Sequence, residues 1–147
     1  MRLLSYNILD GGEGRADPIG EVVQAQRTDL VALVEADDPA VVVRIAGRLK
    51  MESVRAEGHG HSVALLSRWP IVASINHALL RPGLTKCFME AKVRQPSGAE
   101  WIVGVVHLHA WATLEDDVIR CTEIETILKV FEAHRLARRP HRRSIEV

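Results

Sequence analysis

The chain has 147 residues, enough for one domain with a buried core. Its 19 basic side chains balance 19 acidic ones and 47% of its residues are hydrophobic, so the totals argue against a disordered chain and against a strongly polyanionic partner. Cys87 and Cys121 lie far apart and outside any zinc-finger spacing. This argues against a disulfide framework and a structural zinc site.

The beginning of the sequence lacks the pattern of a secretory signal, because its short apolar stretch changes character at Asn7. No apolar run approaches the roughly 20 residues that a membrane-spanning helix needs. We therefore expect no membrane span and, by default, a cytoplasmic location.

The first third of the sequence alternates strand and helix signals. A β-favouring segment enters a glycine-rich loop, helix-start pairs stand at Asp17-Pro18 and Asp38-Pro39, and a continuous apolar run ends at Glu35. The expected elements are a strand at 2–8, a helix at 18–27, a strand at 30–34 and a helix at 38–49.

The rest of the sequence predicts strands followed by one long helix. Residues 96–98 (PSG) indicate a hairpin turn, and Thr113 with Asp116 indicates a capped helix start. The expected elements are strands at 62–67, 71–77, 88–94 and 101–107, and a helix at 114–134 with an apolar stripe of Val118, Ile119, Ile124, Ile127, Leu128 and Phe131. Residues 135–147 have no periodicity and hold five arginines in nine residues, which is typical of a solvated tail.

Asn7 and Glu35 each end an apolar strand, and ligands commonly bind at such strand ends in α/β sheets. A carboxylate beside an amide oxygen suits Mg²⁺, which prefers oxygen ligands and keeps several waters. The alternative is that Glu35 only begins a loop or caps the following helix.

Four histidines form two close pairs in the sequence. His107 and His109 are two residues apart and would share one side of a strand, although no further zinc ligand adjoins them. His59 and His61 alternate with glycines and indicate a flexible turn. A zinc or dinuclear hydrolase built on these four histidines is the third-ranked alternative, behind the two considered below.

Five segments, taken in order, resemble the endonuclease/exonuclease/phosphatase family. They are residues 4–8 (LSYNI), 29–35 (DLVALVE), 63–71 (VALLSRWPI), 105–108 (VVHL) and 120–128 (RCTEIETIL). The sequence departs from the family pattern at Val34, where glutamine is usual, and at Val106, where a polar residue is usual.

The resemblance implies an α+β fold that is half of a four-layer α/β/β/α sandwich, mostly one mixed or antiparallel sheet with flanking helices. It implies a domain at 1–134 followed by a non-family tail at 135–147. It also implies that Glu35 is the principal ligand of Mg²⁺, with Mn²⁺ as a possible substitute. Asn7 would help to arrange metal and phosphate, and His107 would contact the scissile phosphate.

The implied activity is metal-dependent hydrolysis of a phosphoester, of phosphodiesterase, phosphatase or nuclease type, on a nucleic acid or a phospholipid head group. The family's Gly-Asp-x-Asn and Ser-Asp-His segments, which activate water, do not occur in this sequence. We therefore expect a catalytically incomplete chain that ends before the second half of the domain. The second alternative is a non-catalytic binding protein that uses the arginine-rich tail on a nucleic acid. A lone half-sandwich would also leave the strand faces at 63–66 and 101–106 uncovered and open to self-association.

Overall fold

The computed structural model describes residues 1–137, and its elements follow one another closely along the chain. They are β1 (Leu3–Asn7), the 3-10 helix η1 (Asp10–Gly12), α1 (Ala16–Ala25), β2 (Leu30–Val34), α2 (Pro39–Leu49), β3 (Glu52–Ala56), β4 (Val63–Ser67), β5 (Ile71–Asn76), β6 (Cys87–Arg94), β7 (Glu100–His107) and α3 (Leu114–Ala137).

The α+β class is confirmed, but the strands form two sheets where we expected mostly one. The first sheet has the order β1-β2-β4-β3, in which β1 and β2 run parallel and the other pairs run antiparallel. The second sheet is antiparallel, in the order β5-β6-β7. The break between the sheets falls at Arg68–Pro70, where the chain leaves β4 and enters β5 in the other sheet.

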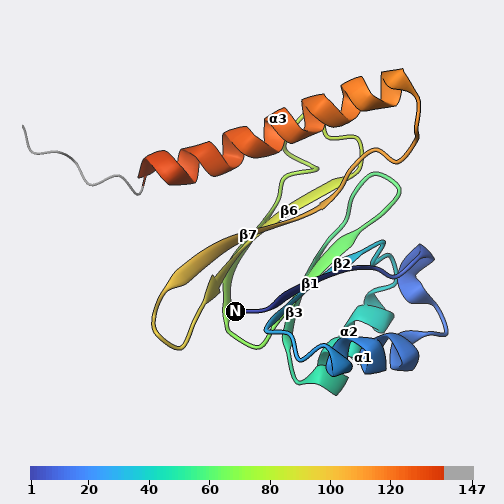
Figure 1. Ribbon diagram of the computed structural model, residues 1–147, viewed down its shortest axis with the longest axis vertical. Coiled ribbons are helices and arrows are strands. Elements are labelled where there is room, and N and C mark those ends of the chain that lie inside the picture. Colours follow the sequence, from blue (N-terminus) through green and yellow to red (C-terminus); the bar gives the residue numbers. More distant parts are fainter. Residues whose placement is uncertain (138–147) are drawn as a thin grey trace, which may run out of the picture.

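Alternating side chains show how the layers pack. In β4, Ala64 and Leu66 face a core shared with α1 and α2, whereas Val63 and Leu65 face the second sheet. The far side of the second sheet packs Phe88 against Val130 of α3. Figure 1 shows α1 and α2 on one outer side, α3 on the other, and the strands between them.

The expectation of an uncovered strand face at 63–66 is wrong. All four side chains from Val63 to Leu66 are fully buried, because the chain carries its own second sheet to cover them. The segment 101–106 is partly exposed, with Trp101 open to solvent and Val105 buried. Residues 63–66 therefore offer no exposed apolar face for self-association.

The long helix α3 is also held by polar contacts to the loop before β6 and the loop after β7. The buried Glu123 accepts hydrogen bonds from the backbone N–H and the hydroxyl of Thr85 and from the N–H of His109. Of the expected apolar stripe, Val118, Ile124 and Leu128 are exposed, so that part of the prediction is wrong. The expected cap is present, because the hydroxyl of Thr113 accepts from the N–H of Asp116.

One strand, β3, escaped prediction because Glu52–Ala56 mixes polar and apolar residues. It lies at the edge of its sheet and pairs only with β4, so its residues need less apolar character. No helix among residues 1–137 is long and apolar enough to cross a membrane.

The core between the sheets should dominate the stability of the fold. Leu65→Ala removes a fully buried side chain from this layer and should lower the free energy of unfolding by about 2–5 kcal/mol. Leu79→Ala, at a side chain that is 69% exposed, should cost less than about 0.5 kcal/mol. Urea denaturation of both variants measures the difference, and equal costs would contradict the described packing.

Candidate functional site

The parallel pairing of β1 and β2 places Asn7 and Glu35 together. Asn7 lies opposite Val34 in the register, so the two strands end at the same edge and Glu35 follows at once. The side-chain amide of Asn7 donates to Oε1 of Glu35 at 2.8 Å, and its own oxygen accepts from the N–H of Leu9 at 2.8 Å. The amide is thus fixed in one orientation between the loop and the carboxylate.

The backbone turns sharply at both strand ends. Leu9, Asp10 and Glu35 have φ angles of 57°, 47° and 58°, a left-handed conformation that costs energy for residues with side chains. The turn lets the N–H of Asp10 donate to Oε2 of Glu35 at 3.0 Å. Gly11, with φ of 75°, follows where an added Cβ would lie 2.9 Å from the backbone nitrogen of Asp38. Strained backbone therefore aims the Glu35 carboxylate and the Asp10 N–H at one another.

His107 reaches the same carboxylate from the other sheet. It is the last residue of β7, and its Nε2 lies 3.4 Å from Oε1 of Glu35. Its side chain is only 8% exposed, and Nδ1 is buried without a hydrogen-bond partner among the described residues. Because an ionised carboxylate can only accept, Nε2 donates this hydrogen bond to Glu35.

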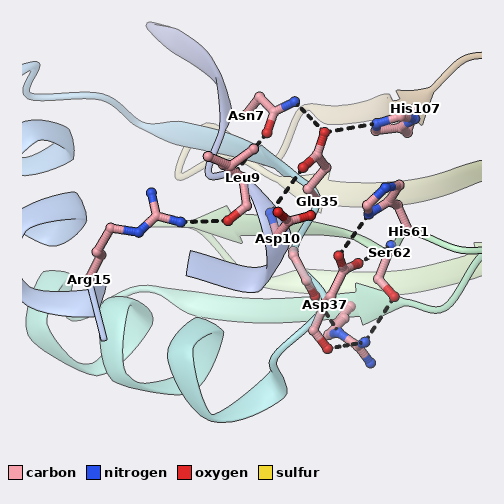
Figure 2. A network of polar contacts seen from close by, with 11 residues as sticks. Asn7, Leu9, Asp10, Arg15, Glu35, Asp37, His61, Ser62 and His107 are labelled. Atoms are coloured by element: carbon pink, nitrogen blue, oxygen red, sulfur yellow. Dashed lines mark hydrogen bonds and ion pairs between the residues drawn. The ribbon is translucent and has the colours of Figure 1, made fainter. Parts of the chain in front are cut away.

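A second acid and a second histidine border Glu35, as Figure 2 shows. One ligand atom from each of Asp10, Glu35 and His61 lies within 4.8 Å of the other two. The His61 ring stacks on the His107 ring, with centroids 5.2 Å apart. Nδ1 of His61 contacts Oδ2 of Asp37 at 2.8 Å, and the other oxygen of Asp37 accepts from the N–H of Ser62 at 2.6 Å.

Arg55 of β3 holds the two loops that carry Asp37 and Ser62. Its guanidinium donates to the carbonyl oxygens of Ala36 and Asp37 and to the hydroxyl of Ser62, at 2.6, 2.8 and 2.9 Å. The loop after β2 and the loop before β4 are thereby joined through one side chain.

Hydrogen bonding keeps the Glu35 carboxylate ionised. The bond from Asn7 is the largest influence, and with those from Asp10 and His107 and the nearby charge of His61 it outweighs partial burial. Together they lower the pKa of Glu35 from 4.5 to about 2. Among the described residues Glu35 has no lysine or arginine partner, and its side-chain contacts are with Asn7 and His107.

Compared by sequence, the chain matches no protein-family model and no curated protein. Compared by structure, it resembles TDP2 from D. rerio in complex with a single-strand DNA product, with a TM-score of 0.72 and 18% identity over 90% of this chain and 54% of that one. TDP2 from Caenorhabditis elegans gives a TM-score of 0.72 and 17% identity over 95% and 44% of the two chains. An endonuclease/exonuclease/phosphatase from Beutenbergia cavernae gives a TM-score of 0.61 and 19% identity over 82% of this chain and 42% of that one.

The chain has the fold of part of these endonuclease/exonuclease/phosphatase structures. It spans about half the length of the solved chains that it resembles. The resemblance first seen in five sequence segments is thus confirmed at the level of the fold.

Within this fold, the three residues that the sequence predicted for the site lie together. Glu35 contacts both Asn7 and His107. The four histidines of the zinc alternative do not converge, because His59 is exposed and His109 pairs with Asp116 at 2.7 Å, beside the start of α3. Of the arginine-rich tail, residues 135–137 form the last part of α3, and 138–147 lie outside the described residues.

Asp10 and Asp37 were not predicted as site residues, and His61 was predicted only as part of a flexible turn and of the zinc alternative. Asp10 lies in the loop three residues after Asn7, and Asp37 lies two residues after Glu35. Acidic residues so close to the ends of two strands could have been predicted as further site residues. The approach of His61 to them was not visible, because it depends on how β3 and β4 pair.

The lowered pKa of Glu35 predicts an acid-dependent contribution to stability. Because folding lowers this pKa, the ionised carboxylate stabilises the folded chain above about pH 4.5, and the contribution is lost as the pH falls toward 2. The free energy of unfolding of the wild type should exceed that of Glu35→Gln by roughly 1–3 kcal/mol at pH 6. This difference in the free energy of unfolding should become smaller at pH 3. Urea titrations at both pH values measure this difference, with Glu13→Gln, an exposed acid in the segment between η1 and α1, as the control. A gap independent of pH would contradict the assignment.

Proposed function

We propose that the chain carries the cation- and phosphate-binding side of a metal-dependent phosphoester hydrolase of phosphodiesterase, phosphatase or nuclease type, with Glu35 as the main ligand of Mg²⁺ or Mn²⁺. Asn7 and His107 are proposed to arrange the cation and the phosphate. The observation that supports this most is the Glu35 carboxylate itself. It is ionised, strained into place at a strand end, and held by three N–H donors from Asn7, Asp10 and His107.

The residues fit a hard divalent cation. An ionised carboxylate has roughly four acceptor positions, and the described donors use three of those on Glu35. The Asp10 carboxylate has no hydrogen bond or ion pair within residues 1–137, so its charge adds to that of Glu35. Two acids with no cationic side chain between them favour a bound cation electrostatically.

Each side chain has a distinct proposed task. A divalent cation bound at Glu35 would polarise a non-bridging phosphoryl oxygen. Asn7 keeps the carboxylate turned toward the site through its bond to Oε1. His107 holds a proton on Nε2, 3.4 Å from Glu35, and can donate it as a hydrogen bond to a phosphate oxygen or as a proton to a leaving oxygen.

A nucleic acid is the proposed substrate class. The support is the structural neighbour from D. rerio, which was solved with a single-strand DNA product. Phospholipid head groups carry the same phosphoester chemistry and are the alternative. The described residues near Glu35 are compatible with the phosphoester common to both classes, and they do not select between the organic groups.

The first test of this proposal is cation binding. Glu35→Gln keeps the shape of the side chain and removes its charge, so it should abolish Mg²⁺ binding measured by isothermal titration calorimetry while leaving the thermal melt cooperative. Glu13→Gln, an exposed carboxylate from the adjoining loop, should bind as wild type does. Equal Mg²⁺ affinity in wild type and Glu35→Gln would rule out Glu35 as the main ligand.

A second expectation concerns turnover by the 147-residue chain. Its sequence has neither Gly-Asp-x-Asn nor Ser-Asp-His, and general-base help alone is worth on the order of 10²- to 10⁴-fold. Residues that act as one unit lose most of their joint effect when one is missing. Hydrolysis of bis(p-nitrophenyl) phosphate with saturating Mg²⁺ should therefore barely exceed that of Glu35→Gln. A rate far above this background would reveal another water-activating group.

A further inference from the structure

Two residues beyond the expected site face the Glu35 carboxylate. Asp10 comes from the loop after β1, and His61 comes from the loop between β3 and β4. Their ligand atoms and one from Glu35 all lie within 4.8 Å of one another, a group that could hold a metal ion. Figure 2 shows the three side chains gathered at the ends of these strands.

The His61 ring is prepared in the manner of a metal ligand. An ionised carboxylate only accepts hydrogen bonds, so Asp37 at 2.8 Å places the ring proton on Nδ1 and leaves a lone pair on Nε2. Histidines that bind metals usually donate their second ring N–H to a carboxylate or carbonyl in this way, which fixes the tautomer and makes the ligand more basic.

Several contacts hold the ring in place before any cation arrives. Asp37 is itself fixed by the N–H of Ser62 at 2.6 Å, and Arg55 ties both flanking loops together. The His61 ring also stacks on the His107 ring, which restricts its rotation. A simple surface ion pair between His61 and Asp37 would need none of these supports, nor the unpaired Asp10 beside it.

We propose that Asp10 and His61 complete, with Glu35, a three-ligand cation site, and that the His61 imidazole makes this site prefer Mn²⁺ over Mg²⁺. The inference rests on the proposed role of Glu35 and adds to it the identity of the cation. Mg²⁺ favours oxygen ligands alone, whereas imidazole nitrogen binds transition-metal ions more strongly. Two carboxylates and one imidazole therefore form a mixed set that suits Mn²⁺ better than Mg²⁺.

The test measures the ratio of Mn²⁺ to Mg²⁺ affinity by calorimetry on the full chain. His61→Gln should weaken Mn²⁺ binding by about tenfold or more and change Mg²⁺ binding much less, because only the nitrogen ligand is lost. Asp37→Asn should weaken Mn²⁺ binding in the same direction by loosening the ring. His59→Gln, an exposed histidine two residues away, is the matched control and should change neither affinity.

A second readout does not depend on affinity. Substoichiometric Mn²⁺ should broaden the ring-proton NMR signals of His61 before those of His59 and His109, since paramagnetic broadening falls steeply with distance. Wild-type binding with an unchanged cation ratio in His61→Gln, or broadening that spares His61, would overturn this inference and leave the role of Glu35 intact. Absence of Mn²⁺ and Mg²⁺ binding in wild type would overturn both.

Discussion

The site depends on one carboxylate held in a left-handed turn at the end of a buried strand. Hydrogen bonds from the Asp10 N–H and from the Asn7 side chain stabilise Glu35 in this conformation. Both donors lie at or just after the end of β1, the neighbouring parallel strand. A shift of one residue in the pairing of β1 and β2 would turn every side chain to the other face and separate Asn7 from Glu35. The register of β1 and β2 therefore determines whether Asn7 can contact Glu35.

The second requirement is the packing of one sheet on the other. His107 belongs to β7, while Glu35 follows β2, and their contact exists only because Leu65 and its neighbours pack against the second sheet. A core of this kind is close-packed and resists small displacements. The apolar layer between the sheets therefore sets the distance between the carboxylate and the imidazole, and a cavity in that layer can change the site without touching it.

Sequence reasoning succeeded where a residue's position followed from one strand. Asn7, Glu35 and His107 each end an apolar run, and the ends of such runs meet at one place in the fold. It failed where position depended on irregular backbone. The left-handed turn at Asp10 and the looped path to His61 have no periodicity to reveal them, and the edge strand β3 lacks the apolar pattern that marks buried strands.

That edge strand also explains how charge is distributed around the site. Arg55 projects from β3 and binds the carbonyl oxygen of Asp37, so the one described cation within hydrogen-bonding reach of this loop sits behind Asp37 and away from Glu35. The positive charge therefore offsets Asp37, whose carboxylate is already engaged by His61 and Ser62. Asp10 and Glu35 keep their negative charge uncompensated by lysine or arginine within residues 1–137. A cation that enters the site therefore meets the carboxylates of Asp10 and Glu35 beside the His61 ring, while the Arg55 guanidinium is bound to the carbonyl oxygens of Ala36 and Asp37.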